Sequence, residues 1–170
     1  MSQIIDRWFL PDGIPLDLCI TYQHDKWLVA LSYIVAAFAS YTAFHVFARL
    51  RSGANAKVRT IWLVIAGTSM GCGIFSMHFI AMLAMRIPIE VRYDPSLTAL
   101  SALFAIGSSG IAFHFAGRDS RSLSDLLIGA VILGSGIGLM HYTGDLALRM
   151  PAHIYFDPTL FALSVLVAVA

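Results

Sequence analysis

The sequence predicts an all-α membrane protein, a polytopic bundle of transmembrane helices. Hydrophobic residues make up 58% of the 170 residues and charged residues 12%, which is more apolar than a soluble domain. Apolar runs of spanning length lie at about 28–48, 60–85, 96–116 and 126–148, and a fifth begins near 159. These runs are too long for barrel strands, and lipid offers no partners to open backbone, so each run is expected to be a helix. The net charge of +1 argues against nucleic-acid binding.

Residues 1–27 are expected to form an outer N-terminal tail. Asp6 and Pro11 interrupt any apolar core of a signal peptide in this segment. The connection between the first and second predicted helices is basic and holds no acidic residue; its charges are Arg49, Arg51, Lys57 and Arg59. The positive-inside rule therefore predicts that this loop is cytoplasmic and that the N-terminus is periplasmic.

The second and fourth predicted helices carry the same pattern 63 positions apart. Gly71, Gly73, Ile74, Met77 and His78 align with Gly134, Gly136, Ile137, Met140 and His141. At an offset of 69, Asp25 and Leu31-Ser32 align with Asp94 and Leu100-Ser101, and Leu163-Ser164 then begins a further copy. The repeat unit is thus a pair of helices. Unit one spans about 24–92, unit two about 93–155, and unit three begins at 156–170, so five helices are at least begun.

Histidines are expected in two layers of the membrane. From the helical rise, His78 lies about 27 Å and His141 about 22 Å from the cytoplasmic starts of their helices, in a hydrocarbon core of about 30 Å. Both imidazoles then lie in the outer third, where His24 at the outer end of the first helix is able to join them. His45 and His114 fall near the cytoplasmic face. Burying a histidine in a membrane helix is costly, which favours a functional role for His78 and His141.

The repeated Met-His pairs favour a metal site. Imidazole together with thioether suits copper, so Met77 and Met140 join the histidines as candidate ligands. Adjacent helical residues point about 100° apart, which makes the histidines the safer donors. Met82 shares a helix face with His78, although core packing explains it at least as well. Asp145 either orients the His141 imidazole or binds the metal directly.

Glycine patterns predict how these segments meet. Gly67 and Gly71 on the second helix, and Gly134 and Gly138 on the fourth, are spaced to permit close helix contact. Direct packing of the two helices through these glycines would bring the two Met-His segments together.

The sequence resembles the MHYT family of bacterial integral membrane sensor domains. The resemblance rests on Met77-His78-Phe79-Ile80-Ala81-Met82, on Met140-His141-Tyr142-Thr143-Gly144 and on His24-Asp25, and it covers about residues 24–170. It implies that 28–170 form an MHYT-type domain, usually of seven helices in three units. It also implies a metal, expected to be copper, near the outer face. Two features depart from the family pattern: the third motif is missing from this chain, and Asp145 stands where a methionine is usual.

The resemblance implies a sensor of oxygen, carbon monoxide, nitric oxide or redox state in the bacterial inner membrane. Its output would be a cytoplasmic signalling domain or protein, such as one that makes or degrades cyclic di-GMP. Tyr142 and Thr143 would donate hydrogen bonds to a bound gas. Association of two chains into a homodimer is an alternative that the sequence leaves open. The chain itself is not expected to be an enzyme. The alternative is a haem-binding electron-transfer protein, because histidine layers at both faces also suit bis-histidine haem.

Overall fold

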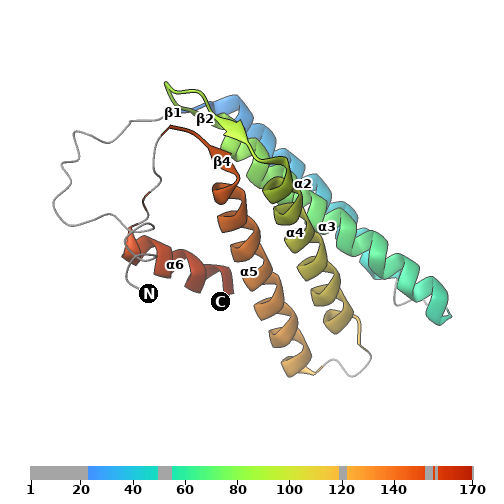
Figure 1. The fold of residues 1–170 in the computed structure, drawn as a ribbon. Helices are drawn as coiled ribbons and strands as arrows, with labels where there is room; N and C mark the ends of the chain where they lie inside the picture. The colour runs from blue at the N-terminus through green and yellow to red at the C-terminus, as the bar shows by residue number, and fades with distance from the viewer. Residues whose placement is uncertain (1–22, 50–54, 119–121, 152–154, 156, 170) are drawn as a thin grey trace.

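The structure, a computed structural model, describes residues 23–49, 55–118, 122–151, 155 and 157–169. These residues form the helices α2 (Lys26–Arg49), α3 (Ala56–Ala84), α4 (Pro95–Ala116), α5 (Leu123–Leu146) and α6 (Pro158–Val169). Of the described helices, α2 to α5 are long and apolar enough to cross a membrane. The predicted all-α membrane bundle is confirmed, and Figure 1 shows its elements in chain order. Residues 1–22 of the predicted tail lie outside the part of the chain that the structure describes.

The helices α2, α4 and α6, which follow one another at the two repeat offsets, each begin at an aspartate that caps the N-terminus. The Asp25 Oδ1 accepts the backbone N–H of Trp27 and Leu28, and the Asp94 Oδ1 accepts those of Ser96 and Leu97. Asp157 caps α6 in the same way. Aspartate satisfies N–H groups that the first helical turn leaves without partners. The two offsets found in the sequence are therefore also offsets between helix starts.

Short strands clamp the two units at the end of the bundle where α2 and α4 begin. The strand β1 (Gln23–His24) pairs antiparallel with β2 (Met85–Arg86), and β3 (Arg92–Tyr93) pairs antiparallel with β4 (Leu148–Arg149). The Asp94 N–H also donates to the carbonyl oxygen of Ala147 at 2.8 Å, and that of Asp25 donates to Ala84 at the same distance. The two helices of each unit are thus joined at this end of the bundle.

Ion pairs reinforce both clamps. Arg86 pairs with Asp25, and the Arg149 guanidinium lies 2.9 Å from the Asp94 carboxylate. The hydrogen bond from Arg86 lowers the pKa of Asp25, and that from Arg149 lowers the pKa of Asp94, with the capping N–H groups acting in the same direction. Both carboxylates therefore stay charged at neutral pH.

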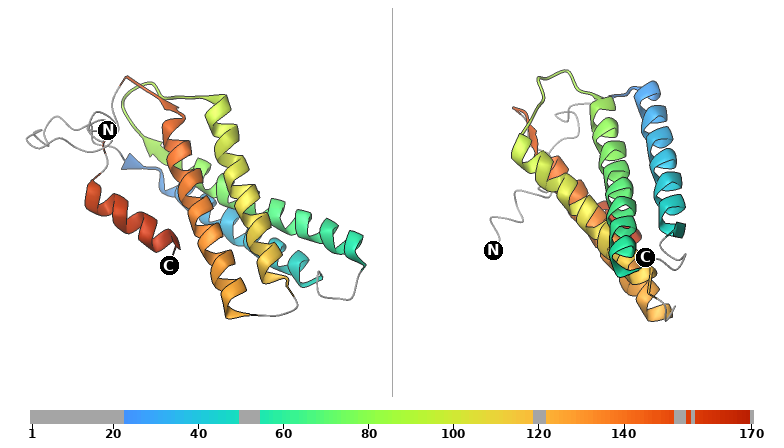
Figure 2. Two further views of the ribbon diagram at one scale, coloured as in Figure 1. Left: turned by 60° about the horizontal axis from the view of Figure 1, so that its bottom comes forward. Right: turned by 90° about the vertical axis from the view of Figure 1, so that its right-hand side faces the viewer.

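The helices α2 to α5 pack side by side in chain order, as the views in Figure 2 show. Within the units, Gly73 lies against Ala39 of α2 and Gly136 against Ser108 of α4. Between the units, Gly67 and Gly71 lie against the backbone of α4. The predicted packing of the second helix on the fourth through these glycines is therefore wrong, because α4 takes that face. The helices α3 and α5 meet instead at His78, which faces His141 and Gly144.

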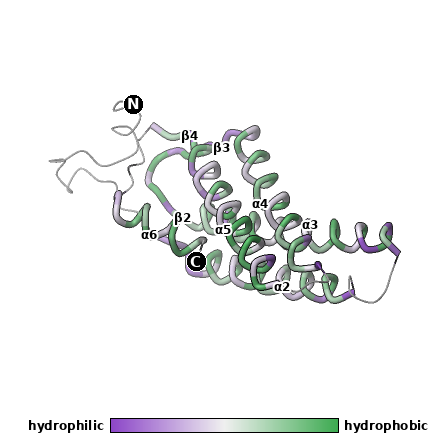
Figure 3. The backbone as a smooth tube through the Cα atoms, turned by 90° about the horizontal axis from the view of Figure 1, so that it is seen from below, coloured by the Kyte–Doolittle hydropathy of each residue, from purple (hydrophilic) through white to green (hydrophobic). Residues whose placement is uncertain are grey.

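The helices are apolar along most of their length, as the colours of the tube in Figure 3 show. Exposed side chains include Trp27, Phe38, Leu103, Leu127 and Val131. The buried core consists mostly of small or flexible side chains such as Ala43, Ala66 and Met70, with Phe113 as its large aromatic member. An exposed apolar surface around a core of small residues is the pattern of a bundle solvated by lipid.

Candidate metal centre

His78 of α3 and His141 of α5 come together in the half of the bundle that adjoins the short strands. Their Nδ1 atoms lie 3.3 Å apart, and one ring donates a hydrogen bond to the other. The ring centroids are 4.9 Å apart and the ring planes are inclined at 73°. The 63-residue repeat places both histidines at equivalent positions along their helices, and the strand clamps hold the neighbouring helix ends in register.

Asp145 completes a group of three possible ligands. Its Oδ2 lies 3.6 Å from the Nε2 of His141, one helical turn earlier on α5. One donor atom from each of His78, His141 and Asp145 can be chosen so that all lie within 4.8 Å of one another. The carboxylate faces the ring nitrogen of His141 that points away from His78. In metal sites, this is the usual partner for the second nitrogen of a coordinating histidine.

The two histidines lie in unequal surroundings. His78 is 8% exposed, and its Nε2 is buried with no hydrogen-bond partner among the described residues. The His141 side chain is 45% exposed and that of Asp145 is 18% exposed. The group is therefore closed on the side of α3 and open on the side of His141.

The distances fit a small metal ion. Imidazole nitrogens bind zinc at about 2.0–2.1 Å, so two of them in a tetrahedral site lie about 3.3 Å apart. The two Nδ1 atoms have this separation without any movement of the helices. Two imidazoles and a carboxylate are also a donor set that first-row transition metals accept.

The other predicted ligands lie in different places. Met140 is 2% exposed and Met82 is 8% exposed, so both are packed in the core, while Met77 is half-buried. Within the described part of the chain, the group of nitrogen and oxygen donors does not include His24. That residue is exposed in β1, opposite Met85.

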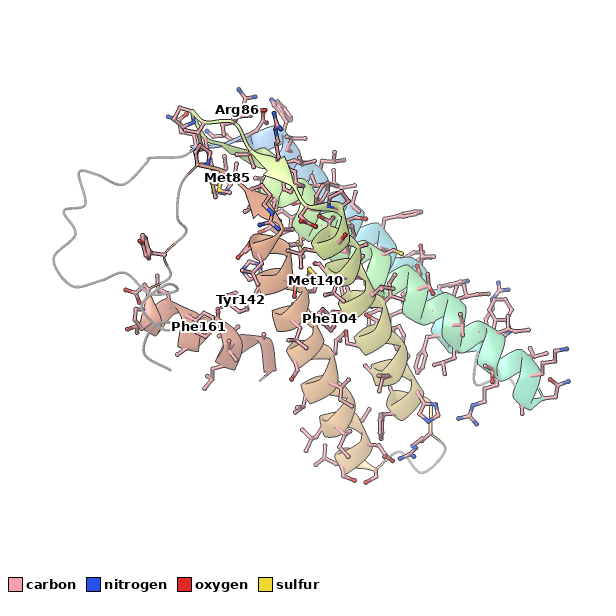
Figure 4. All side chains as sticks on the ribbon, viewed as in Figure 1. Met85, Arg86, Phe104, Met140, Tyr142 and Phe161 are labelled. Carbon is pink, nitrogen blue, oxygen red and sulfur yellow. The ribbon has the colours of Figure 1, made fainter. Side chains whose placement is uncertain are left out.

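Tyr142 connects the candidate centre to α6. Its ring lies 5.0 Å from that of His141 and 4.7 Å from that of Phe161, measured between centroids, and Figure 4 shows it extending from α5 toward α6. Its hydroxyl lies 2.5 Å from the Ser164 Oγ. The predicted hydrogen bond to a gas thus competes with a bond to Ser164. Thr143, the other predicted donor, is half-buried.

Two residues next to His78 were not identified from the sequence. Ser101 is fully buried and its hydroxyl donates to the carbonyl oxygen of Met140 at 2.7 Å. Gly144 lies directly against the His78 imidazole. The repeat places a serine at the equivalent positions Ser32, Ser101 and Ser164. That repetition was the signal in the sequence that could have indicated a role for Ser101.

The chain belongs to the MHYT family. The family model, described as the bacterial signalling protein N-terminal repeat, matches residues 71–129 and 134–170. The described residues include four helices that are long and apolar enough to cross a membrane, so this member of a signalling family is a multi-pass membrane protein. No solved structure matches the chain.

Several curated proteins are similar to almost the whole chain. The bifunctional diguanylate cyclase/cyclic di-GMP phosphodiesterase MucR of Pseudomonas aeruginosa is 44% identical over 86% of this chain and 21% of its own length. The cyclic di-GMP phosphodiesterase NbdA of the same organism is 41% identical over 93% of this chain and 20% of its own length. The signaling protein YkoW of Bacillus subtilis is 33% identical over 91% of this chain and 19% of its own length. The chain thus spans about a fifth of these relatives, in the part that carries the MHYT repeat.

Proposed function

We propose that this chain is the sensor region of a membrane signalling protein and that it binds one metal ion between His78 and His141. The observation that supports this most directly is the meeting of two imidazoles, one from each repeat unit, at 3.3 Å inside the membrane-spanning bundle. Ionisable groups in transmembrane segments are costly and usually functional. A pair of histidines beside a carboxylate is difficult to explain by packing alone.

Copper is the metal we propose. Imidazole binds copper in both oxidation states, and the thioethers of Met77, Met140 and Met82 occur in the same helical turns as the histidines. Bound copper would supply a one-electron couple and a coordination position for oxygen, carbon monoxide or nitric oxide. The half-exposed side of His141 would admit the gas, and His24 would lie at the outer surface above the site.

The geometry favours a single ion over the alternative of haem at this pair. Two axial imidazoles on opposite sides of an iron, each at about 2 Å, place their nitrogens about 4 Å apart with the macrocycle between them. The Nδ1 atoms of His78 and His141 are closer than this and in direct contact. Purified protein should therefore show no Soret band.

The output would be cyclic di-GMP turnover in a cytoplasmic domain. The names of MucR and NbdA describe such activities, and this chain matches only the MHYT part of each. The sensor region itself would be non-enzymatic, in the inner membrane, with its N-terminus in the periplasm. Tyr142 would carry a change at His141 to α6 through its contacts with Phe161 and Ser164.

Equilibrium copper binding to purified protein tests the proposal. We expect His78→Ala or His141→Ala to abolish stoichiometric binding, His24→Ala to weaken it, and His45→Ala to leave it intact as a matched control on α2. Exposure of the reduced, copper-loaded protein to carbon monoxide should give an infrared band that both binding-site variants lack. Full copper occupancy in a folded His78→Ala, His141→Ala double variant would refute the proposal.

A further inference from the structure

Gly144 closes one side of the His78 imidazole. A Cβ atom at this position would lie 2.6 Å from the Nε2 of His78 and 3.2 Å from its Cδ2. Real Cβ atoms do not approach this closely, so only glycine allows α5 to lie against the ring. As Gly144 and His78 are both buried, the Nε2 edge of the imidazole faces the backbone of α5. The other edge, with Nδ1, faces His141.

Ser101 fixes the segment of α5 that carries Gly144. Its hydroxyl donates to the carbonyl oxygen of Met140, which is also the acceptor of the Gly144 N–H in a regular helix. The corresponding serines Ser32 and Ser164 donate to carbonyls of their own helices instead, those of Val29 and Phe161. Among these three equivalent serines, Ser101 is the one whose hydroxyl donates to a backbone carbonyl of another helix in the described structure. The Ser101 Oγ would lie 3.5 Å from a Cβ at Gly144, so it borders the same space.

We propose that Gly144 and Ser101 are positioning residues of the metal centre, and this rests on the function proposed above. They hold His78 with Nε2 sealed against α5, so that Nδ1 is the atom of His78 that binds the ion. His141, which is half-exposed and whose Nε2 faces Asp145, is the ligand that adjusts its position. The centre thus has a fixed ligand on α3 and a movable ligand on α5, next to Tyr142 and α6.

The matched control lies on the same helix. A methyl group at Gly138 would meet no atom of a neighbouring helix within 4 Å in the described part of the chain. Gly138→Ala therefore makes the same chemical change as Gly144→Ala, two helical turns away, without touching His78. A general effect of alanine on α5 would appear in both variants.

Zinc is a suitable probe because it is diamagnetic and binds the same nitrogen donors. We expect Gly144→Ala to weaken zinc and copper binding about 10 to 100-fold, the usual loss when a group that orients a ligand is changed, and Gly138→Ala to bind like the wild type. Nuclear magnetic resonance of protein labelled with ¹⁵N-histidine reports which nitrogen is coordinated. The wild type should show zinc on the Nδ1 of His78 and a proton on its Nε2.

Ser101→Ala provides a second test with a smaller change in volume. We expect affinity to fall about 2 to 10-fold, the equilibrium factor of one net hydrogen bond, and the histidine spectrum to show a mixture of Nδ1 and Nε2 coordination at His78. Ser32→Ala, which removes a hydrogen bond within α2, should change neither the metal affinity nor the coordinating nitrogen of His78. A purely structural role of Ser101 would lower stability without altering the coordinating nitrogen.

The outcomes separate this inference from the proposed function. Zinc on the Nε2 of His78, or equal affinities for the Gly144→Ala and Gly138→Ala variants, would overturn the positioning roles while leaving the metal site intact. A wild-type protein that binds neither zinc nor copper would refute the proposed function itself, and this inference with it.

Discussion

One methyl group at Gly71 should separate the two repeat units. A Cβ there would lie 2.3 Å from the Ile106 Cα, 2.6 Å from its backbone nitrogen and 2.7 Å from the Ala105 carbonyl oxygen. Non-bonded carbon atoms rest at about 3.5–4.0 Å, so α3 and α4 must move apart by about 1 Å. All three obstructing atoms belong to the backbone and cannot rotate away. Overpacking of this kind costs about 1–3 kcal/mol or more.

Gly107→Ala is the control for this prediction, because a Cβ at Gly107, next to Ile106, meets nothing within 4 Å in the described structure. Unfolding in mild detergent, followed by circular dichroism during titration with a denaturing detergent, measures both variants. Gly71→Ala should unfold at clearly lower denaturant than the wild type, whereas Gly107→Ala should unfold at the same concentration or higher. Copper affinity should fall in parallel, because α3 carries His78. Equal unfolding of the two variants would refute the account of the α3–α4 contact.

Three other perturbations test the clamps, the topology and the connection to α6. The pKa of Asp94 is lowered in the folded protein, so its contribution to stability is present above its unfolded value of 3.8 and is lost as the pH falls through the folded value. The melting temperature of Asp94→Asn should therefore depend less on pH than that of the wild type below about pH 4, and identical profiles would contradict this. Single cysteines are placed at Glu90 and Lys57 in a protein without Cys19 and Cys72. On intact spheroplasts an impermeant thiol reagent should label position 90 and not position 57. Labelling only at position 57 would reverse the topology. Tyr142→Phe removes the hydroxyl that contacts Ser164, so hydrogen exchange in α6 should become faster while copper affinity changes little.

The long helices were predictable because their signal is averaged over many residues. The first predicted span, 28–48, differs from α2 by two residues at its start and one at its end. Capping by Asp25 and Asp94 accounts for the starts of α2 and α4 more closely than hydropathy does. The strands β1 to β4 were not predicted, because two residues are too few to show an alternating pattern. They form where the aspartate caps and their arginine partners bring the chain together.

The meeting of His78 and His141 was predictable, but the surroundings of the site were not. The repeat indicated that His78 and His141 lie at the same level, since equal sequence spacing gives equal rise along parallel helices. It contained no information on which helix fills the groove at Gly67 and Gly71, and that contact belongs to α4. The role of Gly144 also depends on a contact between helices, and therefore on the packing of the whole bundle.

Pulsed electron paramagnetic resonance of protein loaded with one equivalent of Cu(II) tests the central claim most directly, because it counts the imidazoles bound to the ion. The account predicts coupling to two histidine nitrogens in the wild type and to one in His78→Ala or His141→Ala wherever residual copper remains. It predicts no histidine coupling at stoichiometric copper in the double variant, with helix content by circular dichroism unchanged. Coupling to two imidazoles that persists in the double variant would show that copper binds elsewhere and would contradict the account.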